Sequence, residues 1–214
     1  MKDKQGLTLV ELMIVLFLSM LLMAAVYMTY QLQHSSGQVQ FQVAATQQDL
    51  RAVMEIIATD IQHAGLDPRP TQSIQGIDIN DCGLNNLHMR MDLNGDGLTN
   101  TVNEDISYRL DAGGNLLRVD NSPGVGVTRV IANNVTVLNF AYEDRQTDGT
   151  RNSISPAGPA SAYDNKTLTT AQADEVRFVE VTIRMQTDRT DPQSGQRIMR
   201  ELKRSICRRN GILF

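Results

Sequence analysis

The chain has 214 residues, which is enough for one domain of ordinary size and an appendage. Its formal net charge of −4 argues against general electrostatic binding of nucleic acid, which needs a basic face. The charge is uneven, however, because residues 197–209 carry six Lys or Arg side chains and one acid, Glu201. A solvated strand face and a contact with an acidic neighbour would both account for this run.

An apolar stretch follows the first few residues, and it carries no charge between Leu12 and Tyr30. As a helix rising about 1.5 Å per residue it covers about 28 Å, close to the hydrocarbon thickness of a bilayer. A secretory signal peptide has a shorter apolar region that ends at a small-residue cleavage site, and neither feature is found here. We therefore expect a retained membrane anchor. Lys2 and Lys4 precede the span, so the positive-inside rule places the N-terminus in the cytoplasm and residues after about 31 outside.

Glu11 is the one acid near the start of this apolar segment. A carboxylate in hydrocarbon is costly unless it is paired or neutralised, so such acids are functional candidates. The alternative is that Glu11 marks the interfacial end of the helix and stays in water.

Residues 4–11, KQGLTLVE, resemble the type IV prepilin processing signal, in which a short basic leader precedes Gly, an apolar residue, Thr, two apolar residues and Glu. In that family a membrane-embedded aspartyl prepilin peptidase cuts after the Gly and methylates the new amine. The resemblance covers the first 30 residues. It implies cleavage between Gly6 and Leu7 and N-methylation of Leu7, where Phe is usual.

The resemblance also implies a partner for Glu11. Cleavage creates a cationic amine at the edge of the apolar segment, and opposite charges attract strongly at low dielectric. In the prepilin family this Glu pairs with the N-terminal amine of an adjacent subunit in a helical filament. Glu11 is therefore interpreted as an assembly residue.

The helical pattern continues beyond the span. Five apolar residues follow the spacing of one helix face: Leu50, Val53, Met54, Ile57 and Ile61. We predict one helix from about Leu7 to His63, with a kink or soft point at 35–37 and an end at Ala64-Gly65.

The helix end DLRAVMEIIATDIQHAG, residues 49–65, extends the resemblance. Minor pilins of the PilW type and J-type pseudopilins of type II secretion carry a similar helix end, and the Ala-Gly ending favours the PilW type.

Residues after 66 change to short alternating segments separated by turns. Val179, Val181 and Ile183 alternate with polar residues, as is typical of a strand. The polar residues 146–174 are interpreted as loops. Strands are predicted at 87–91, 105–110, 115–119, 127–131, 135–142 and 176–185, with a last strand at 197–207 because the family often ends in one.

These segments predict an α+β fold of the type IV pilin kind, with a long N-terminal hydrophobic helix followed by a β-rich globular domain. The predicted organisation is a leader peptide (1–6), a transmembrane and filament-core helix (7–30), an amphipathic continuation of that helix (31–63) and a β-rich exported domain (64–214).

Residues 92–105, DLNGDGLTNTVNED, match the first half of a calcium loop. Ca²⁺ takes six to eight oxygen ligands, which alternate side chains on a tight loop can supply. The twelfth position is Asn103 rather than Glu, so a strict EF-hand does not fit, and an Asx-rich surface turn is the alternative. The candidate ligands are Asp92, Asn94, Asp96, the carbonyl of Leu98, Asn100, Glu104 and Asp105.

Cys82 and Cys207 lie far apart and lack the spacing of a zinc or redox motif. If the domain is exported, they are predicted to form a disulfide. In a reducing cytosol they would be two buried thiols.

Neither a nucleophile–base arrangement nor a phosphate-binding loop occurs in the sequence, so an enzyme is not expected. The chain is predicted to be a minor pilin in the inner membrane, with its C-terminal domain in the periplasm before it moves to a pilus or the cell surface. The predicted partners are prepilin peptidase, the inner-membrane assembly platform and other pilins or pseudopilins in a filament. The alternatives are a type II secretion pseudopilin at the tip, an adhesin or DNA receptor, and a free anchored sensor.

Overall fold

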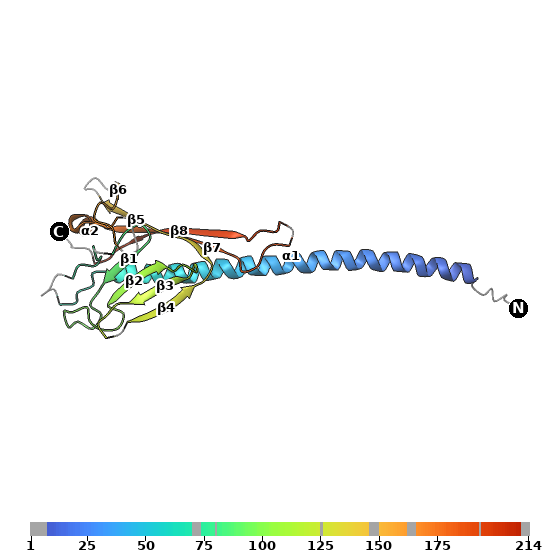
Figure 1. Ribbon diagram of the computed structural model, residues 1–214, viewed down its shortest axis with the longest axis horizontal. Coiled ribbons are helices and arrows are strands. Elements are labelled where there is room, and N and C mark those ends of the chain that lie inside the picture. The colour runs from blue at the N-terminus through green and yellow to red at the C-terminus, as the bar shows by residue number, and fades with distance from the viewer. Residues whose placement is uncertain are drawn as a thin grey trace.

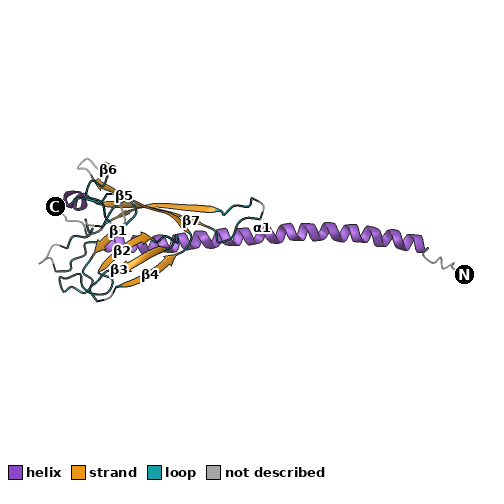
Figure 2. Cartoon of the chain, viewed as in Figure 1, coloured by secondary structure: helices purple, strands orange, loops and turns teal. Residues whose placement is uncertain are grey.

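One long helix, α1, runs from Leu9 to His63 and extends well beyond the globular part as a bare rod (Figure 1; Figure 2). The computed structural model describes residues 8–69, 74–79, 81–124, 126–145, 150–161, 166–192 and 194–210. The predicted helix is confirmed over this range. It continues without interruption through residues 35–37, where a kink was predicted.

The end of α1 depends on two glycines. Gly65 has a φ of 78°, in the left-handed region, and its N–H donates to the Arg90 carbonyl oxygen at 2.8 Å. A Cβ at Gly76 would lie 2.5 Å from the Gly65 nitrogen, so the two chain segments approach closely only because both residues lack side chains. This contact joins the end of the helix to the first strand.

Two antiparallel four-stranded sheets make up the rest of the globular part. One sheet has the order β1-β2-β3-β4 and the other has the order β6-β5-β7-β8. The strands are β1 (Leu87–Arg90), β2 (Asp105–Leu110), β3 (Leu116–Asp120), β4 (Val127–Ala132), β5 (Val135–Arg145), β6 (Arg151–Ile154), β7 (Phe178–Gln186) and β8 (Met199–Cys207), and a short helix α2 (Thr170–Glu175) precedes β7. The predicted α+β arrangement is confirmed.

The six internal strands and the last strand lie close to their predicted positions, but the prediction of loops across 146–174 was wrong in two places. β6 has one buried side chain, Ile154, and pairs with β5 through its backbone, so it shows no apolar alternation. α2 is only six residues long, and its start is set by a capping box between Thr169 and Gln172. Neither element has the periodicity by which sequence patterns are recognised.

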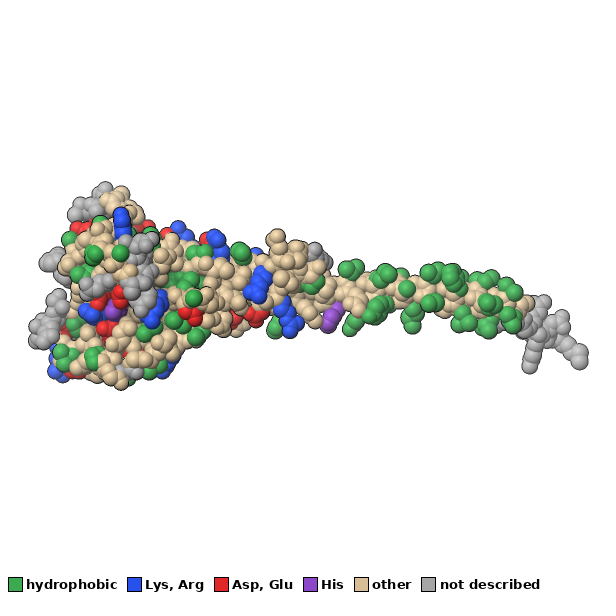
Figure 3. Space-filling model, in the orientation of Figure 1, with side chains coloured by type: hydrophobic (Ala, Val, Ile, Leu, Met, Phe, Trp, Pro, Cys, Tyr) green, Lys and Arg blue, Asp and Glu red, His purple; other side chains and the backbone are tan. Residues whose placement is uncertain are grey.

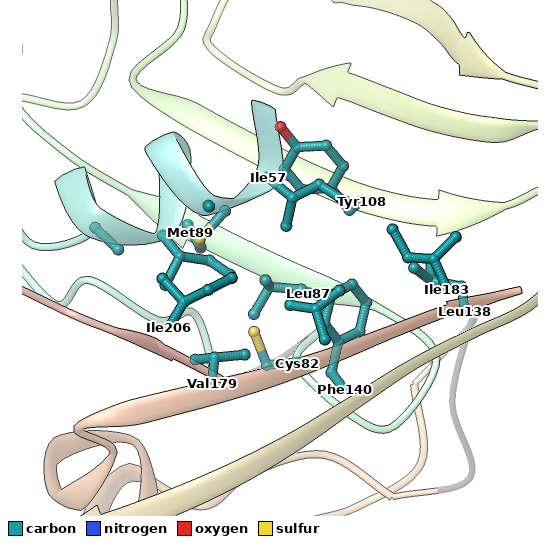
Figure 4. Close-up of a cluster of buried hydrophobic side chains, with 14 of the residues drawn as sticks. Ile57, Cys82, Leu87, Met89, Tyr108, Leu138, Phe140, Val179, Ile183 and Ile206 are labelled. Atoms are coloured by element: carbon teal, nitrogen blue, oxygen red, sulfur yellow. The ribbon is translucent and has the colours of Figure 1, made fainter. Parts of the chain in front are cut away.

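The core lies where the C-terminal part of α1 meets the two sheets. Ile57 of α1, Tyr108 of β2 and Phe140 of β5 are each 0% exposed, and Figure 4 shows these side chains converging in one cluster. The predicted apolar stripe of α1 is buried throughout, from Leu50 to Ile61. The last turns of the predicted amphipathic continuation of the helix therefore pack into the core of the globular part.

A polar network inside this interface joins α1 to the first sheet. Arg118 Nε donates to Asp60 Oδ2 at 2.9 Å, and the Tyr108 hydroxyl donates to the same oxygen. Arg118 Nη1 also donates to Asn103 Oδ1 at 2.9 Å. Burial, and secondly the charge of Asp60, raise the pKa of Tyr108, so its hydroxyl stays protonated and remains a donor.

We predict that Arg118→Met destabilises the chain by about 3 kcal/mol, because it leaves the largely buried charge of Asp60 without its cationic partner and with only the Tyr108 hydroxyl as a donor. The matched control is Arg184→Met, which removes the exposed pair with Glu201 and should cost about 1 kcal/mol or less. Scanning calorimetry of the detergent-solubilised full chain measures both. Equal and small losses in the two variants would contradict a structural role for the Asp60 network.

Candidate functional site

The N-terminal part of α1 exposes its apolar side chains. Leu9, Phe17 and Tyr30 are 73%, 64% and 60% exposed, and Figure 3 shows this half of the helix covered with apolar side chains on the visible face. Among the described residues, α1 is the one helix long and apolar enough to cross a membrane. Its most apolar stretch is not buried by any other described part of the chain. Such a surface requires another apolar environment, either lipid or other helices.

The first turn of α1 is closed by Glu11. Its Oε2 accepts hydrogen bonds from the Thr8 N–H at 2.8 Å and the Thr8 hydroxyl at 2.9 Å, while Thr8 Oγ1 accepts from the Glu11 N–H at 3.3 Å. This reciprocal arrangement is a capping box. The predicted cleavage and methylation positions, Gly6 and Leu7, lie outside the described residues. Glu11 thus has an intrachain role that the sequence analysis missed, although the Thr-x-x-Glu spacing at 8–11 indicates it.

The capping box turns the Glu11 carboxylate toward the start of the helix. The unpaired N–H groups of a helix start carry partial positive charge, which favours a carboxylate there. The prepilin resemblance places the processed amine one residue before Thr8. Capping and pairing with an amine are therefore compatible, because a carboxylate has about four lone-pair sites.

In the Asp-rich loop, Asp92 is fully buried and both of its carboxylate oxygens are engaged. Oδ1 accepts from the Gly95 N–H at 2.6 Å and Oδ2 from the Gly97 N–H at 2.8 Å. Gly95 and Gly97 have φ angles of 77° and 83°, which favour glycine at both positions. Asn94 Nδ2 donates to Asp96 Oδ2 at 2.9 Å at the exposed edge of the loop.

Glu104 closes the same loop from the other side. It is fully buried, and its carboxylate accepts N–H groups from Leu93 at 3.0 Å and Thr101 at 2.8 Å. Asp105 has a different environment, since its carboxylate contacts His88 and Arg90. Over the described ranges, no group of three or more His, Cys, Asp or Glu side chains is arranged to hold a metal ion. Calcium at this loop stays a prediction.

A second polar cluster surrounds His88 of β1. His88 Nε2 contacts Asp105 Oδ1, and its Nδ1 lies 3.7 Å from carboxylate oxygens of both Asp78 and Asp81. Arg90 Nη2 lies 2.5 Å from Asp78 Oδ2. Burial acts to raise the pKa of Asp105, but the hydrogen bond and charge of His88, together with Arg90, lower it below its usual value.

These groups come from β1, β2 and the loop before β1, so their pairing is tertiary. His88 and Asp105 lie on paired strands, two positions apart in register, since His88 pairs with Ser107 and Asp105 pairs with Arg90. The cluster holds the loop before β1 against the first sheet and satisfies acids that would otherwise be buried unpaired.

The predicted Cys82–Cys207 disulfide is absent, because both cysteines are free. Cys82 points into the core (Figure 4), where its sulfur accepts from the His88 N–H at 2.9 Å. Cys207 is exposed, since strand alternation turns the preceding Ile206 inward. The two side chains therefore lie on opposite sides of the second sheet.

We predict that a maleimide labels Cys207 in the folded chain, whereas Cys82 reacts only after denaturation. Cys82 is 0% exposed, and burial raises the pKa of its thiol, so both access and thiolate formation are suppressed. Mass spectrometry of alkylated peptides measures the two sites, with Cys207→Ser as the control. Equal labelling of both sites in the native chain would contradict this arrangement.

Two family models match the chain. The model described as prokaryotic N-terminal methylation motif matches residues 1–27, which include the capping box and the start of the exposed apolar helix. The model described as prepilin peptidase-dependent protein B matches residues 39–206, from the middle of α1 to the end of β8. Among curated proteins no match was found. The chain is thus type IV prepilin-like, and it belongs to the family of prepilin peptidase-dependent protein B.

Proposed function

We propose that the chain is a minor pilin, a structural or assembly-priming subunit of a type IV pilus that prepilin peptidase cleaves after Gly6 and methylates at Leu7. The observation that carries the proposal is the exposed apolar half of α1, which starts at the capping box of Thr8 and Glu11 and is not buried by any of the residues that the structure describes. Membrane lipid would cover this surface before assembly. The helices of other pilins would cover it in the filament.

The mechanism is assembly by lateral burial of α1, with Glu11 setting the register. Transfer of apolar side chains from lipid to neighbouring helices gains mainly close packing, which specifies position poorly. An ion pair at low dielectric specifies the axial position of a subunit well, because a neighbouring subunit in the wrong register would leave the Glu11 carboxylate unpaired. The assembly platform in the inner membrane would extract the subunit with its globular part on the periplasmic side.

The charge distribution of the second sheet supports a structural role over a DNA receptor. Lys203 pairs with Glu180 at 2.7 Å and Arg204 pairs with Glu55 of α1 at 2.7 Å. These two of the six cations in the basic C-terminal run are neutralised by neighbours in the same chain. Binding to the phosphate backbone of DNA would instead require a row of unpaired cations.

We predict that Glu11→Ala leaves cleavage and membrane insertion intact and reduces incorporation into filaments by about tenfold or more, because a charge-assisted hydrogen bond contributes about 1.5–3 kcal/mol. The matched variant Glu11→Gln keeps a capping-box acceptor but removes the charge. It should fail like Glu11→Ala if pairing with the neighbouring amine is what matters. Immunoblots of sheared pili against membrane fractions measure incorporation.

Four results bear against the proposal. Normal incorporation of Glu11→Gln would assign Glu11 to capping alone. Normal incorporation of both variants would remove its assembly role. A mature chain that retains Met1, measured by intact mass, would overturn processing by prepilin peptidase and with it the minor pilin. Incorporation into a type II secretion pseudopilus in place of a pilus would favour the pseudopilin alternative.

We also propose that the Asp-rich loop binds Ca²⁺ through its exposed oxygen ligands Asn94 and Asp96, with Asp92 at its base. The support is chemical: these side chains alternate around a tight glycine loop, as hard cations require. The carbonyl of Leu98 and the side chain of Asn100 would complete part of the shell.

We predict that millimolar calcium raises the melting temperature of the full chain, with about 2.7 kcal/mol gained at a hundredfold excess over Kd. Asp96→Ala is the informative variant, because this exposed side chain can be removed with little effect in chelator. Asp92→Ala should destabilise the loop even in chelator, since two buried N–H groups lose their acceptor. Identical melting curves of the wild type in calcium and in chelator would rule calcium out.

A further inference from the structure

The connection between β7 and β8, residues 187–198, reaches back along α1 toward its bare half (Figure 1). Asp191 and Pro192 at its far end line a small cleft with Ser35 and Ser36 of the helix. We call this connection the arm. A backbone hydrogen bond closes its base, where the Thr187 N–H donates to the Ile198 carbonyl oxygen at 3.0 Å. The arm therefore places loop residues beside the helix shortly after the apolar span.

Two neighbouring clefts lie between the arm and α1. The larger has a volume of about 720 Å³ and is lined by Tyr30, His34, Gly37 and Phe41 on the helix and by Arg189 on the arm, among others. The smaller, of about 490 Å³, is lined by Arg189 and Arg197 against the helix. Arg189 lines both clefts, and Arg197 lines the smaller one. The larger cleft reaches Tyr30 at the end of the apolar span.

Cationic side chains of the arm lack the ion pairs that cationic side chains on β7 and β8 form. Arg184 and Lys203 are paired with Glu201 and Glu180. Arg189 and Arg197 are exposed and form no ion pair within the described part of the chain. Figure 3 shows Lys and Arg side chains at the end of the globular part that adjoins the bare helix.

The two acids of the arm are held by other groups. Asn134 Nδ2 donates to Asp188 Oδ1. Asp191 Oδ2 accepts from the Ser194 hydroxyl at 2.8 Å and closes the turn of the arm. These hydrogen bonds leave both carboxylates charged, and Asp188 lines both clefts beside Arg189. The exposed guanidinium groups of Arg189 and Arg197 are the donors available to an external anion.

The position of the clefts corresponds to the headgroup layer of a membrane crossed by the start of α1. Tyr30 ends the apolar stretch and stacks on His34 with ring centroids 6.0 Å apart, and tyrosines of this kind collect at the membrane interface. The headgroup layer is about 5–7 Å thick on each side of the hydrocarbon. Gly37 lies about 10 Å along the helix from Tyr30, so the larger cleft spans this layer, and arginine side chains can extend several ångströms toward it.

We propose that these clefts bind the headgroup of an anionic phospholipid, with its phosphate between Arg189 and Arg197 and its glycerol end against Tyr30 and His34. The guanidinium group binds phosphate oxygens in a forked geometry that an exposed arginine can adopt. The inference rests on the proposed function, because it requires the first half of α1 to lie in a membrane before assembly. Its role there is to hold the globular part at a fixed height and orientation on the membrane surface.

The test uses the full chain in detergent, titrated with phosphatidylglycerol or phosphatidylcholine and examined by native mass spectrometry for retained lipid. The test variant is Arg189→Gln/Arg197→Gln. The matched control is Arg184→Gln/Lys203→Gln, which removes the same charge from ion pairs on the same sheet. Melting curves verify that both variants fold.

The wild type and the control should retain phosphatidylglycerol in preference to phosphatidylcholine. The test variant should lose this preference by roughly 25-fold, taking about fivefold for each arginine near an anionic lipid surface. An unchanged preference in the test variant would overturn the inference. Displacement of the lipid by an equal concentration of inorganic phosphate would also overturn it, since it would indicate a simple anion site.

Two further outcomes separate this inference from the minor pilin proposal. If the test variant keeps its lipid preference but no longer enters filaments, the arginines face an acidic neighbouring subunit, and the lipid site is overturned while the pilin role stands. If the wild-type chain is neither processed nor extracted with membranes, the proposed function fails, whatever the lipid titration gives.

Discussion

Burial of one helix face between two sheets is the interaction on which the rest of the structure depends. Ile57 and Ile61 are 0% and 1% exposed, and they lie on the same continuous helix as Phe17, which is 64% exposed. The C-terminal part of α1 thus belongs to a domain core, while its apolar N-terminal stretch is left unburied by the described residues. Because a helix is stiff, fixing one half in the core fixes the direction of the other. The globular part and the exposed apolar stretch therefore have a defined orientation relative to one another.

Polar contacts set how α1 sits in that core. Apolar packing tolerates some rotation of a helix, whereas the shared bonds of Asp60 with Arg118 and Tyr108 have defined directions. Glu55 pairs with Arg204 of β8 at 2.7 Å on the exposed side of the same helix. One contact reaches the first sheet and the other reaches the second. The Asp60 contacts orient α1 on the first sheet, whereas the exposed Glu55–Arg204 pair adds only a weak contact to the second sheet.

Several acidic side chains in the globular part already bind backbone N–H groups or basic side chains of the same chain. Asp92 and Glu104 accept N–H groups of their own loop, and Asp105 lies with Arg90 beside His88. A buried carboxylate needs such partners, because desolvation without them costs several kcal/mol. These hydrogen bonds to backbone N–H groups explain the presence of acids in a glycine-rich loop even if the loop binds no metal. It also leaves Asp96, at the exposed edge, as the side chain whose removal distinguishes a cation site from a structural turn.

The sequence by itself determined the long helix, the prepilin-type start and most strands, because each has a local signature: an apolar run, a Thr-x-x-Glu spacing or a strict alternation such as that of β7. It could not determine that Cys82 and Cys207 lie on opposite sides of a sheet, since that depends on strand pairing and on which face Ile206 takes. The partners of His88 and Asp60 were likewise decided by the tertiary structure alone, as they depend on strand pairing and on how α1 packs against the first sheet. Short polar elements such as β6 and α2 escaped prediction because their stability comes from neighbouring strands and caps rather than from their own apolar pattern.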